Sequence, residues 1–276
     1  MSTTDFIDSD DPIVADLLAS TIELVAEAGG WIAPTTTFVC RDGQLHVEST
    51  EEANSPLFHI PRAAFVRVDD ATWSDNPEQL EMLSVADHLS DIEVEMLYVQ
   101  VALHNQCKKL SWMSKTHPWL APDLPNEVIE AVRAILPTFR IPAMTAADTL
   151  WANRCFKIAL DNDEAQQRVL IPLVDLLNHH EQGAIGSWSG DSFDVTNAQP
   201  LNANECALNY GMNRDPLELA AAYGFVDSDS PYVPTSALSE ATRTHLAYLL
   251  ESCAKYPSSI ACQIIAEAAR RNLGAS

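Results

Sequence analysis

The first part of the chain carries apolar residues at the spacing of an amphipathic helix. Their stripe consists of Val14, Leu18, Ile22 and Val25. Asp11 is suited to cap this helix, Pro12 fits its first position, and Gly29 with Gly30 ends it. The pattern therefore predicts a helix between Asp11 and the two glycines.

Beyond these glycines the pattern changes to short segments rich in β-branched and aromatic residues. They are interrupted by Asp-Gly or by proline and are too short for helices, so they predict strands. The expected strands of this region are residues 37–41, 44–48, 57–60 and 64–68.

Helical spacing returns in the middle of the chain. It predicts helices over residues 91–109 and 126–136, and a third helix that opens at Thr145 and runs through Phe156. Strands are expected next at residues 169–173 and 206–210. The last expected helices are residues 215–223, 237–254 and 258–272. Helices between two strand-rich regions predict an α+β fold.

Composition places the chain among globular proteins, because 47% of its 276 residues are apolar and 20% are charged. Residues 1–11 are rich in aspartate and are expected to form a flexible acidic N-terminus, not a signal peptide. No apolar run approaches the roughly 18 residues of a membrane span, so we expect no membrane partner. The six cysteines lack zinc-ligand spacing, which suggests buried thiols and a cytoplasmic protein.

The charge balance is strongly acidic, with 16 basic and 39 acidic residues and a formal net charge of −23. Such a charge repels nucleic acid and would favour a basic protein or an amine as substrate. The simpler interpretation is solubility alone. We favour it because the acidic residues are spread from Asp5 to Glu267 without a concentrated block.

Two segments carry polar residues where periodicity would place core residues. The first is an apolar run over residues 169–177 that leads through Asp175 into Asn178 and His179. The second ends at Tyr210 and is followed thirteen residues later by Tyr223. No Gly-rich phosphate loop and no G-x-S-x-G elbow occurs elsewhere, so neither phosphate-loop nor serine-hydrolase chemistry is indicated.

As an ordered set, these residues resemble the SET-domain methyltransferases, in the branch of the Rubisco large-subunit and actin-histidine methyltransferases. The matching positions are Pro172, Asp175, Asn178, His179, Glu205, Tyr210, Gly211, Tyr223, Gly224 and Phe225. The likeness extends more loosely over residues 28–31, 60–62, 119–125 and 151–156. Singly, each of these residues is more typical of a core or a turn.

The resemblance implies a SET-domain fold, in which small β-sheets of pseudoknot-like topology are interrupted by a helical insert. It divides this chain into an N-terminal SET part (residues 12–83), a helical insert (84–144), a C-terminal SET part (145–230) and a short helical tail (231–276). Cofactor and acceptor would enter from opposite faces.

The resemblance also implies S-adenosylmethionine as cofactor and an N-methyltransferase activity on a lysine or histidine side chain of a protein. Asn178 and His179 would hold the cofactor, Phe225 would pack on its adenine, Arg154 would approach its carboxylate, and Gly43 would let the backbone come close to it.

The tyrosines would carry the chemistry, with Tyr210 as the catalytic tyrosine beside the cofactor and Tyr223 lining the acceptor channel. Methyl transfer from a sulfonium is an in-line displacement, so catalysis consists mainly of holding donor and acceptor in a dry channel. A phenol can orient the nitrogen lone pair, and no metal is needed.

Two departures from the family keep other functions open. Leu45 stands where the family has the second glycine of a Gly-x-Gly turn, and only about fifty residues follow Phe225 in place of a large substrate-binding domain. The shortened tail would suit an enzyme for a small-molecule amine. The lost glycine would suit a catalytically silent SET-like binding module. Among protein substrates, the choice between lysine and histidine is open.

Overall fold

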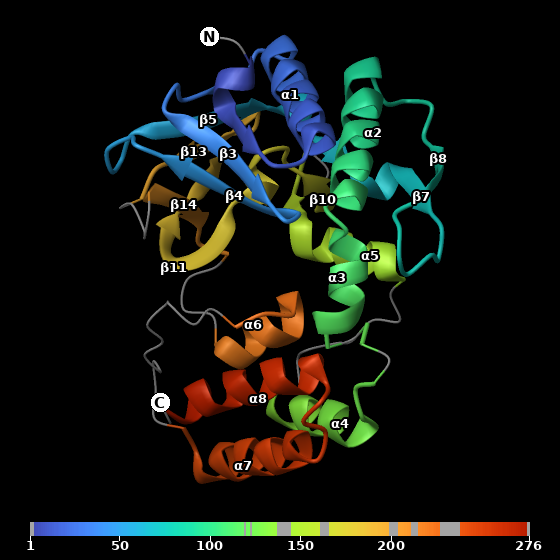
Figure 1. The fold of residues 1–276 in the computed structure, drawn as a ribbon, viewed down its shortest axis with the longest axis vertical. Coiled ribbons are helices and arrows are strands. Elements are labelled where there is room, and N and C mark those ends of the chain that lie inside the picture. Colours follow the sequence, from blue (N-terminus) through green and yellow to red (C-terminus); the bar gives the residue numbers. More distant parts are fainter. Residues whose placement is uncertain are drawn as a thin grey trace. The chain divides into compact units, whose positions relative to one another are not determined.

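The computed structural model describes residues 3–118, 120–121, 123–136, 145–160, 166–198, 204–210, 215–226 and 238–274. This part of the chain forms a mixed α+β protein with eight α-helices and several small sheets (Figure 1). Contacts divide the chain into two compact units. We call them the sheet unit, Met1–Leu110 with Ala147–Asn209, and the helical unit, Ser111–Ala146 with Tyr210–Ser276.

The largest sheet of the sheet unit has five strands and joins distant parts of the chain. Its order is β1 (Ile7–Ser9), β3 (Thr36–Arg41), β4 (Gln44–Ser49), β14 (Glu205–Leu208) and β11 (Asn178–Ala184). β3 and β4 form an antiparallel hairpin, whereas β11 runs parallel to β14. The two strand-rich regions predicted from the sequence therefore share one sheet.

Three smaller sheets complete the sheet unit. They are β12 (Gly186–Trp188), β13 (Ser192–Thr196), β5 (Pro56–Pro61) and β2 (Trp31–Ile32); β6 (Val66–Arg67), β10 (Gln167–Leu170) and β9 (Phe156–Ile158); and β7 (Ala71–Trp73) with β8 (Met82–Val85). Buried side chains of β3 and β5, such as Phe38 and Phe58, stack with ring centroids 6.0 Å apart and form part of the core.

Helices α1 (Pro12–Glu27) and α2 (Asp91–Gln106) lie side by side in the sheet unit (Figure 1). As predicted, the Asp11 side chain caps α1 and accepts hydrogen bonds from the amides of Ile13 and Val14. The Gln100 amide of α2 donates to Thr21 of α1 over 3.1 Å, a buried polar link between the two helices. Helix α5 (Ala146–Arg154) lies further along the chain.

The helical unit contains α4 (Asn126–Ile135), α6 (Pro216–Tyr223), α7 (Glu240–Ala254) and α8 (Ile260–Leu273), while α3 (Lys109–Thr116) crosses the division between the units. Their apolar faces form a separate core that includes Val128, Leu217, Leu246 and Ile265, each at most 1% exposed. The C-terminal region is therefore helical, as expected. The contact division assigns α4 and residues from Tyr210 onward to the same unit, so it differs from the boundaries that the resemblance implies.

Residues 3–9 differ from the flexible terminus that we expected. A short 3-10 helix, Thr3–Phe6, leads into β1, which pairs in parallel with β3. The Arg41 guanidinium donates to the Asp8 carbonyl at 2.9 Å and also pairs with the Asp8 carboxylate. Asp8 is therefore anchored by a cation that lies 33 positions further on, which no local pattern reveals.

The helix predicted over residues 91–109 ends early. Lys108 has a φ of +51°, in the left-handed region, so α2 stops at Gln106 and α3 starts at Lys109. Only Val66–Arg67 of the expected strand 64–68 is extended, and 3-10 helices flank it.

Two later boundaries also need correction. Phe156 does not continue α5 but opens β9, where it pairs with Val169 and packs on Phe193 with ring centroids 4.9 Å apart. The expected strand 169–173 ends at Leu170, and Leu173 has a φ of +68°. The expected strand 206–210 lies at Glu205–Leu208. Start and end residues of the helices at Asn126, Pro216 and Ile260 agree with the predictions to within about two residues.

None of the helices in the described ranges combines the length and apolarity needed to cross a membrane.

Candidate functional site

Gly43, the glycine predicted to contact a cofactor, lies in the tight turn between β3 and β4. Its φ is +74°, and Asp42 before it has a φ of +50°, a pair of left-handed residues typical of a two-residue hairpin. A Cβ at position 43 would lie 3.4 Å from the Cys107 carbonyl oxygen, so the turn packs closely against the end of α2. Leu45 is 6% exposed and pairs with Cys40 in the hairpin. It is a core residue of the strand and lies beyond the turn.

Arg154, predicted to approach a carboxylate, is the half-buried last residue of α5. Its Nη1 donates to the backbone carbonyl of Asp175 over 3.0 Å. Asp175 belongs to a 3-10 helix (η4, Val174–Leu176) that directly precedes β11. The guanidinium therefore holds the backbone just before the Asn178-His179 pair.

Asn178 and His179 open β11 and lie opposite Ala207 and Leu208 of β14. The Asn178 side chain is exposed, and its Nδ2 donates to Glu205 Oε1 over 2.8 Å. The two motif segments that stood out in the sequence are thus hydrogen-bonded neighbours in the sheet. A ligand that used the Asn178 amide would have to replace or share the contact with Glu205.

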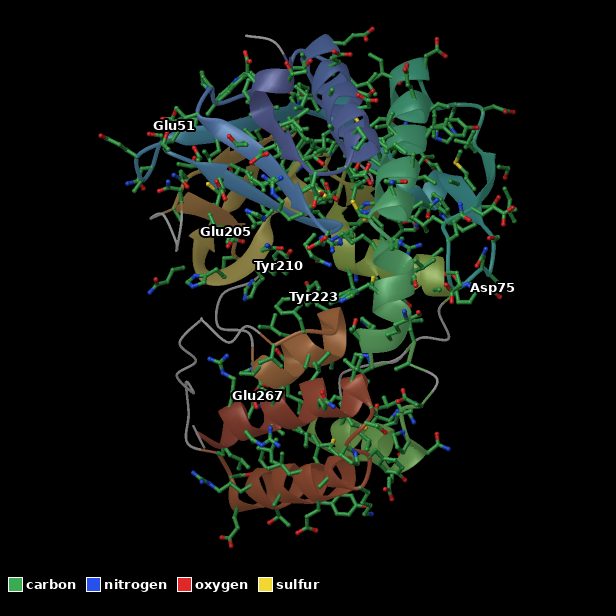
Figure 2. All side chains as sticks on the ribbon, in the orientation of Figure 1. Glu51, Asp75, Glu205, Tyr210, Tyr223 and Glu267 are labelled. Atoms are coloured by element: carbon green, nitrogen blue, oxygen red, sulfur yellow. The ribbon has the colours of Figure 1, made fainter. Side chains whose placement is uncertain are left out.

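Tyr210, Tyr223 and Phe225 form an aromatic group in the helical unit. The ring centroid of Tyr210 lies 5.2 Å from that of Tyr223 and 6.5 Å from that of Phe225, and the last two are 6.1 Å apart. Figure 2 shows the rings of Tyr210 and Tyr223 close together. All three side chains are half-buried. The structure thus brings these three predicted site residues together, and the roles that the resemblance implies for them stay predictions.

A glycine fixes the path of the chain between Tyr223 and Phe225. Gly224 caps α6 in the left-handed conformation with a φ of +73°. A Cβ at this position would lie 2.9 Å from the Cα of His117, closer than Cβ atoms pack in real proteins, so only glycine fits without a shift of the backbone. Burial lowers the pKa of His117 to about 4, so this histidine is neutral at pH 7, and its Nε2 lies 3.1 Å from the Ala222 carbonyl oxygen.

A second feature of the sheet unit was not predicted as a group. His104, Lys109, Arg154 and Asp175 gather from the end of α2, the start of α3, the end of α5 and η4, and we call them the inner polar cluster. His104 Nε2 lies 3.5 Å from Asp175 Oδ2, and these two side chains are 1% and 0% exposed. Neither nitrogen of His104 and neither carboxylate oxygen of Asp175 has a well-formed hydrogen bond, although the backbone amides of Leu173 and Asp175 are near enough to favour the charged carboxylate. Buried polar atoms without partners are rare and call for an explanation.

Burial and the two cations shift the pKa values within this cluster. Burial raises the pKa of Asp175 to about 7, although the charges of Arg154 and Lys109 oppose the shift. Burial, Arg154 and Lys109 together lower the pKa of His104 well below its usual value. Burial and Arg154 lower the pKa of Lys109 to about 8. His104 is consequently neutral near pH 7, so its contact with Asp175 is not an ion pair.

Sequence patterns could have indicated only part of this cluster. Asp175 was noticed because it interrupts an apolar run, and Arg154 came from the resemblance. His104 and Lys109 lie in a stretch with ordinary helical spacing. No local signal distinguishes them, because their burial depends on segments far away in the sequence.

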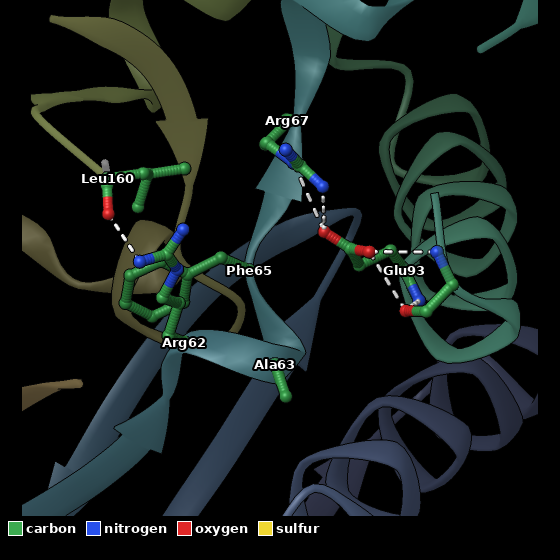
Figure 3. A pocket seen from close by; sticks show the side chains of 7 residues that line it. Arg62, Ala63, Phe65, Arg67, Glu93 and Leu160 are labelled. Atoms are coloured by element: carbon green, nitrogen blue, oxygen red, sulfur yellow. Dashed lines mark hydrogen bonds and ion pairs between the residues drawn. The ribbon is translucent and has the colours of Figure 1, made fainter. Parts of the chain in front are cut away.

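A pocket of about 420 Å³ lies elsewhere in the sheet unit and is shown in Figure 3. It is lined in part by Arg62, Arg67 and Glu93. Arg67 donates to Glu93 Oε1 through Nε and Nη2, and the Ser90 amide and hydroxyl donate to the other oxygen of Glu93. Arg62 donates to the Leu160 carbonyl. The charges that line this pocket are already engaged within the protein.

Acidic side chains are distributed over both units, as the residues labelled in Figure 2 illustrate: Glu51, Asp75, Glu205 and Glu267. Within the described ranges, no three His, Cys, Asp or Glu side chains gather in a way that could hold a metal ion. The acidic side chains that the structure describes are thus spread over both units and do not cluster as metal ligands.

No family model matches this chain, and no curated protein matches it.

Proposed function

We propose that this chain is an S-adenosylmethionine-dependent N-methyltransferase with a SET-type fold, acting on a lysine or histidine side chain of a protein. The observation that carries the proposal is the parallel pairing of β11 with β14, which puts Asn178 and His179 opposite Ala207 and Leu208. Two segments with the ordered motif residues of the family are therefore neighbours in a sheet, although about thirty positions separate them in the sequence.

The residues present fit the cofactor best at its carboxylate end. Arg154 and the nearly buried Lys109 are cations in one small region, and the Gly43 turn packs against Cys107 two residues before Lys109. Asn178 and His179 would bind a more polar part of the cofactor from β11. Phe225 would stack on its adenine. A sulfonium-bound methyl group, supplied by the cofactor, is the species that the reaction transfers.

The aromatic group provides what the acceptor requires. A nitrogen can attack only through a free lone pair, so an ammonium group must first lose its proton to water or to a neighbouring base. The Tyr210 hydroxyl would orient that lone pair, and the half-buried rings of Tyr223 and Phe225 would restrict water near it. Because such catalysis consists of positioning, it depends on the rings being held rigidly.

Two observations favour a second candidate, a catalytically silent SET-like module. The Asn178 amide is exposed and already donates to Glu205, and Leu45 fills the core where the family has a glycine. Both features would weaken a cofactor site. An enzyme for a small-molecule amine has no structural observation of its own in its favour.

A transfer experiment separates these candidates. The purified chain is incubated with methyl-labelled S-adenosylmethionine and a cell lysate, and label is followed in proteins and in metabolites. The proposal predicts a labelled protein whose modified residue is lysine or histidine. Label in a small amine alone would contradict the protein substrate, and a folded chain that transfers no label would support the silent module.

A further inference from the structure

We propose that Lys109 is a second cation, beside Arg154, in an anion site that binds the carboxylate group of the cofactor. This inference rests on the proposed function and deepens it, because neither the motif residues nor the resemblance assigns a role to Lys109.

The first observation is the burial of Lys109 without a partner. Its side chain is 8% exposed, and it forms no hydrogen bond or ion pair with any residue in the described ranges. Lysines are almost never so deeply buried unless they are paired. The chain contains 39 carboxylate residues, yet none of the described ones pairs with this ammonium. A missing partner of opposite charge is the simplest explanation.

The second observation is that other positive charges lie near Lys109. The charge of Arg154 acts on it strongly enough to lower its pKa further after burial has done so. Lys109 is also the first residue of α3, where the unpaired amides of a helix give a partial positive charge. These positive contributions lie in one desolvated region, and the Asp175 carboxylate offsets them only in part. A bound anion would relieve the remaining positive charge.

The charges also select the kind of anion. His104 is neutral near pH 7, while Lys109 and Arg154 are cationic and Asp175 is close to half ionised. With Asp175 ionised, the inner polar cluster has one net positive charge. A monoanion such as a carboxylate neutralises it, whereas a phosphate dianion would leave an excess negative charge buried. Arginine with a single lysine also matches the two oxygens of a carboxylate.

The Gly43 turn connects this site with the predicted cofactor residues. Position 43 packs on the backbone of Cys107, and Lys109 follows two residues later. Burial raises the pKa of the Cys107 thiol to about 12, so this neighbour stays neutral and does not serve as the counter-ion.

The test is a comparison of two ligands by titration calorimetry: S-adenosylmethionine and its decarboxylated analogue. The wild-type chain should bind the carboxylate-bearing ligand more tightly. Lys109→Met should reduce this preference by about tenfold or more, the loss expected for one hydrogen bond to a charged group. Lys109→Arg should restore most of it. The control is Lys108→Met, which removes the exposed neighbouring charge and should leave the preference unchanged.

A wild-type measurement keeps the inference testable if Lys109→Met does not fold. The preference for the carboxylate ligand should fall as pH is raised from 7 to about 9.5, because Lys109 loses its proton with a pKa near 8 while Arg154 keeps its charge. Other titratable groups that face Lys109 are His104, Cys40, Cys107 and Asp175. Asp175, with a pKa near 7, is half ionised at the start of this window and mostly ionised by pH 8, so the fall above pH 8 is the part that reports Lys109. Cys107 stays protonated throughout.

The outcomes separate this inference from the proposed function. If both ligands weaken equally in Lys109→Met, or the preference is unchanged there and across the pH range, the role of Lys109 is wrong while cofactor binding stands. If the folded wild type binds neither ligand, the proposed function is wrong. The anion site is then tested with acetate against chloride at equal ionic strength: a rise in melting temperature that Lys109→Met abolishes supports it, and no rise overturns it.

Discussion

At the scale of single residues, this protein holds ionisable side chains where solvation is poor. The Asp175 side chain is fully buried, and neither of its oxygens has a well-formed hydrogen bond. Lys109 is nearly buried. Their pKa values move toward the neutral form of each group, upward for the acid and downward for the base. Such shifts indicate that the folded state tolerates these groups at a cost in stability. Residues retained at such a cost are candidates for function.

Asp175→Asn tests this cost through its pH dependence. The folded-state pKa of Asp175, about 7, lies above the usual 3.8, so the folded protein holds the proton more tightly than the unfolded chain does. Stability from this group is present at low pH and is lost as pH rises from about 4 to 7. Relative to wild type, the variant should therefore become more stable over that window, by at most about 4 kcal/mol, and change little above it.

Urea unfolding of both proteins at several pH values between 4 and 8 measures this difference. Parallel stability curves across the window would show that Asp175 titrates normally and that its burial is tolerated for another reason.

Tyr210→Phe tests the catalytic role proposed for the Tyr210 hydroxyl. The substitution keeps the ring that packs on Tyr223 and Phe225, so the melting temperature and cofactor affinity should change little. Turnover should fall about 10²–10³-fold, the effect of removing one preorganised hydrogen bond near the reacting atoms. Tyr223→Phe should have a smaller effect or change the number of methyl groups added. Single-turnover methyl transfer and a melting curve, measured for each variant, distinguish these roles. Wild-type turnover in Tyr210→Phe would exclude a catalytic role for the hydroxyl. Loss of folding in that variant would show that Tyr210 is a core residue.

At the scale of secondary structure, a capping residue can both start a helix and bind it to a distant helix. Asp215 accepts hydrogen bonds from the amides of Leu217 and Glu218 at the start of α6. Its two carboxylate oxygens also accept from the Asn272 side chain in α8, at 2.7 and 2.6 Å. One carboxylate thus both caps α6 and joins it to the last helix of the helical unit.

Asp215→Ala should therefore destabilise the protein by more than loss of a cap alone. The cap contributes about 1 kcal/mol, and the nearly buried Asn272 amide would lose partners worth roughly another 1–3 kcal/mol. The control is Ser239→Ala, because Ser239 caps α7 at an exposed position through the Thr242 amide and should cost about 1 kcal/mol or less. Denaturant unfolding of the full chain gives both values, and equal losses would rule out the link to α8.

Local signals predicted the helices of this protein better than its strand pairing. Asp11 located its helix from the sequence because a cap acts on amides two or three residues away, and the structure shows Asp215 and Ser259 in the same role at α6 and α8. The parallel pairs β1–β3 and β11–β14 join segments far apart in the sequence, and the flexible terminus was predicted in error for that reason. The break at Lys108 was missed because helical spacing continues on both sides of it.

The same difference between local signals and distant contacts applies to the candidate site. Tyr210, Tyr223 and Phe225 were singled out through the resemblance, and the structure places the centroids of their rings within 6.5 Å of one another. The inner polar cluster could not be predicted, because the sequence around His104 and Lys109 looks like any helix surface. Only the packing of α2, α3, α5 and η4 makes those side chains buried neighbours.

At the scale of the whole molecule, the net charge of −23 is the dominant long-range feature. The acidic residues occur in both the sheet unit and the helical unit. Such a charge attracts basic acceptors from solution and accelerates their encounter at low salt. If the charge serves solubility alone, it need not change the rate of encounter with a substrate. Kinetics can therefore decide between attraction of a basic substrate and solubility as the role of the charge.

If the acceptor is a basic protein, kcat/KM should fall roughly three- to tenfold between 50 and 500 mM salt, while kcat stays nearly constant. The reason is that screening weakens encounter but not the chemical step. Steady-state kinetics at several salt concentrations, with a neutral peptide carrying the same acceptor residue as control, checks this expectation. A kcat/KM that is independent of salt would leave solubility as the meaning of the charge.

The central claim, that the chain binds S-adenosylmethionine, is tested most directly by titrating the folded protein with the cofactor in a calorimeter, in the presence of a chelator. We expect saturable heat without any metal, and a stabilisation that follows the bound fraction, about 2.7 kcal/mol at a hundredfold excess over Kd. A folded sample that gives no heat and no rise in melting temperature at millimolar cofactor would contradict cofactor binding.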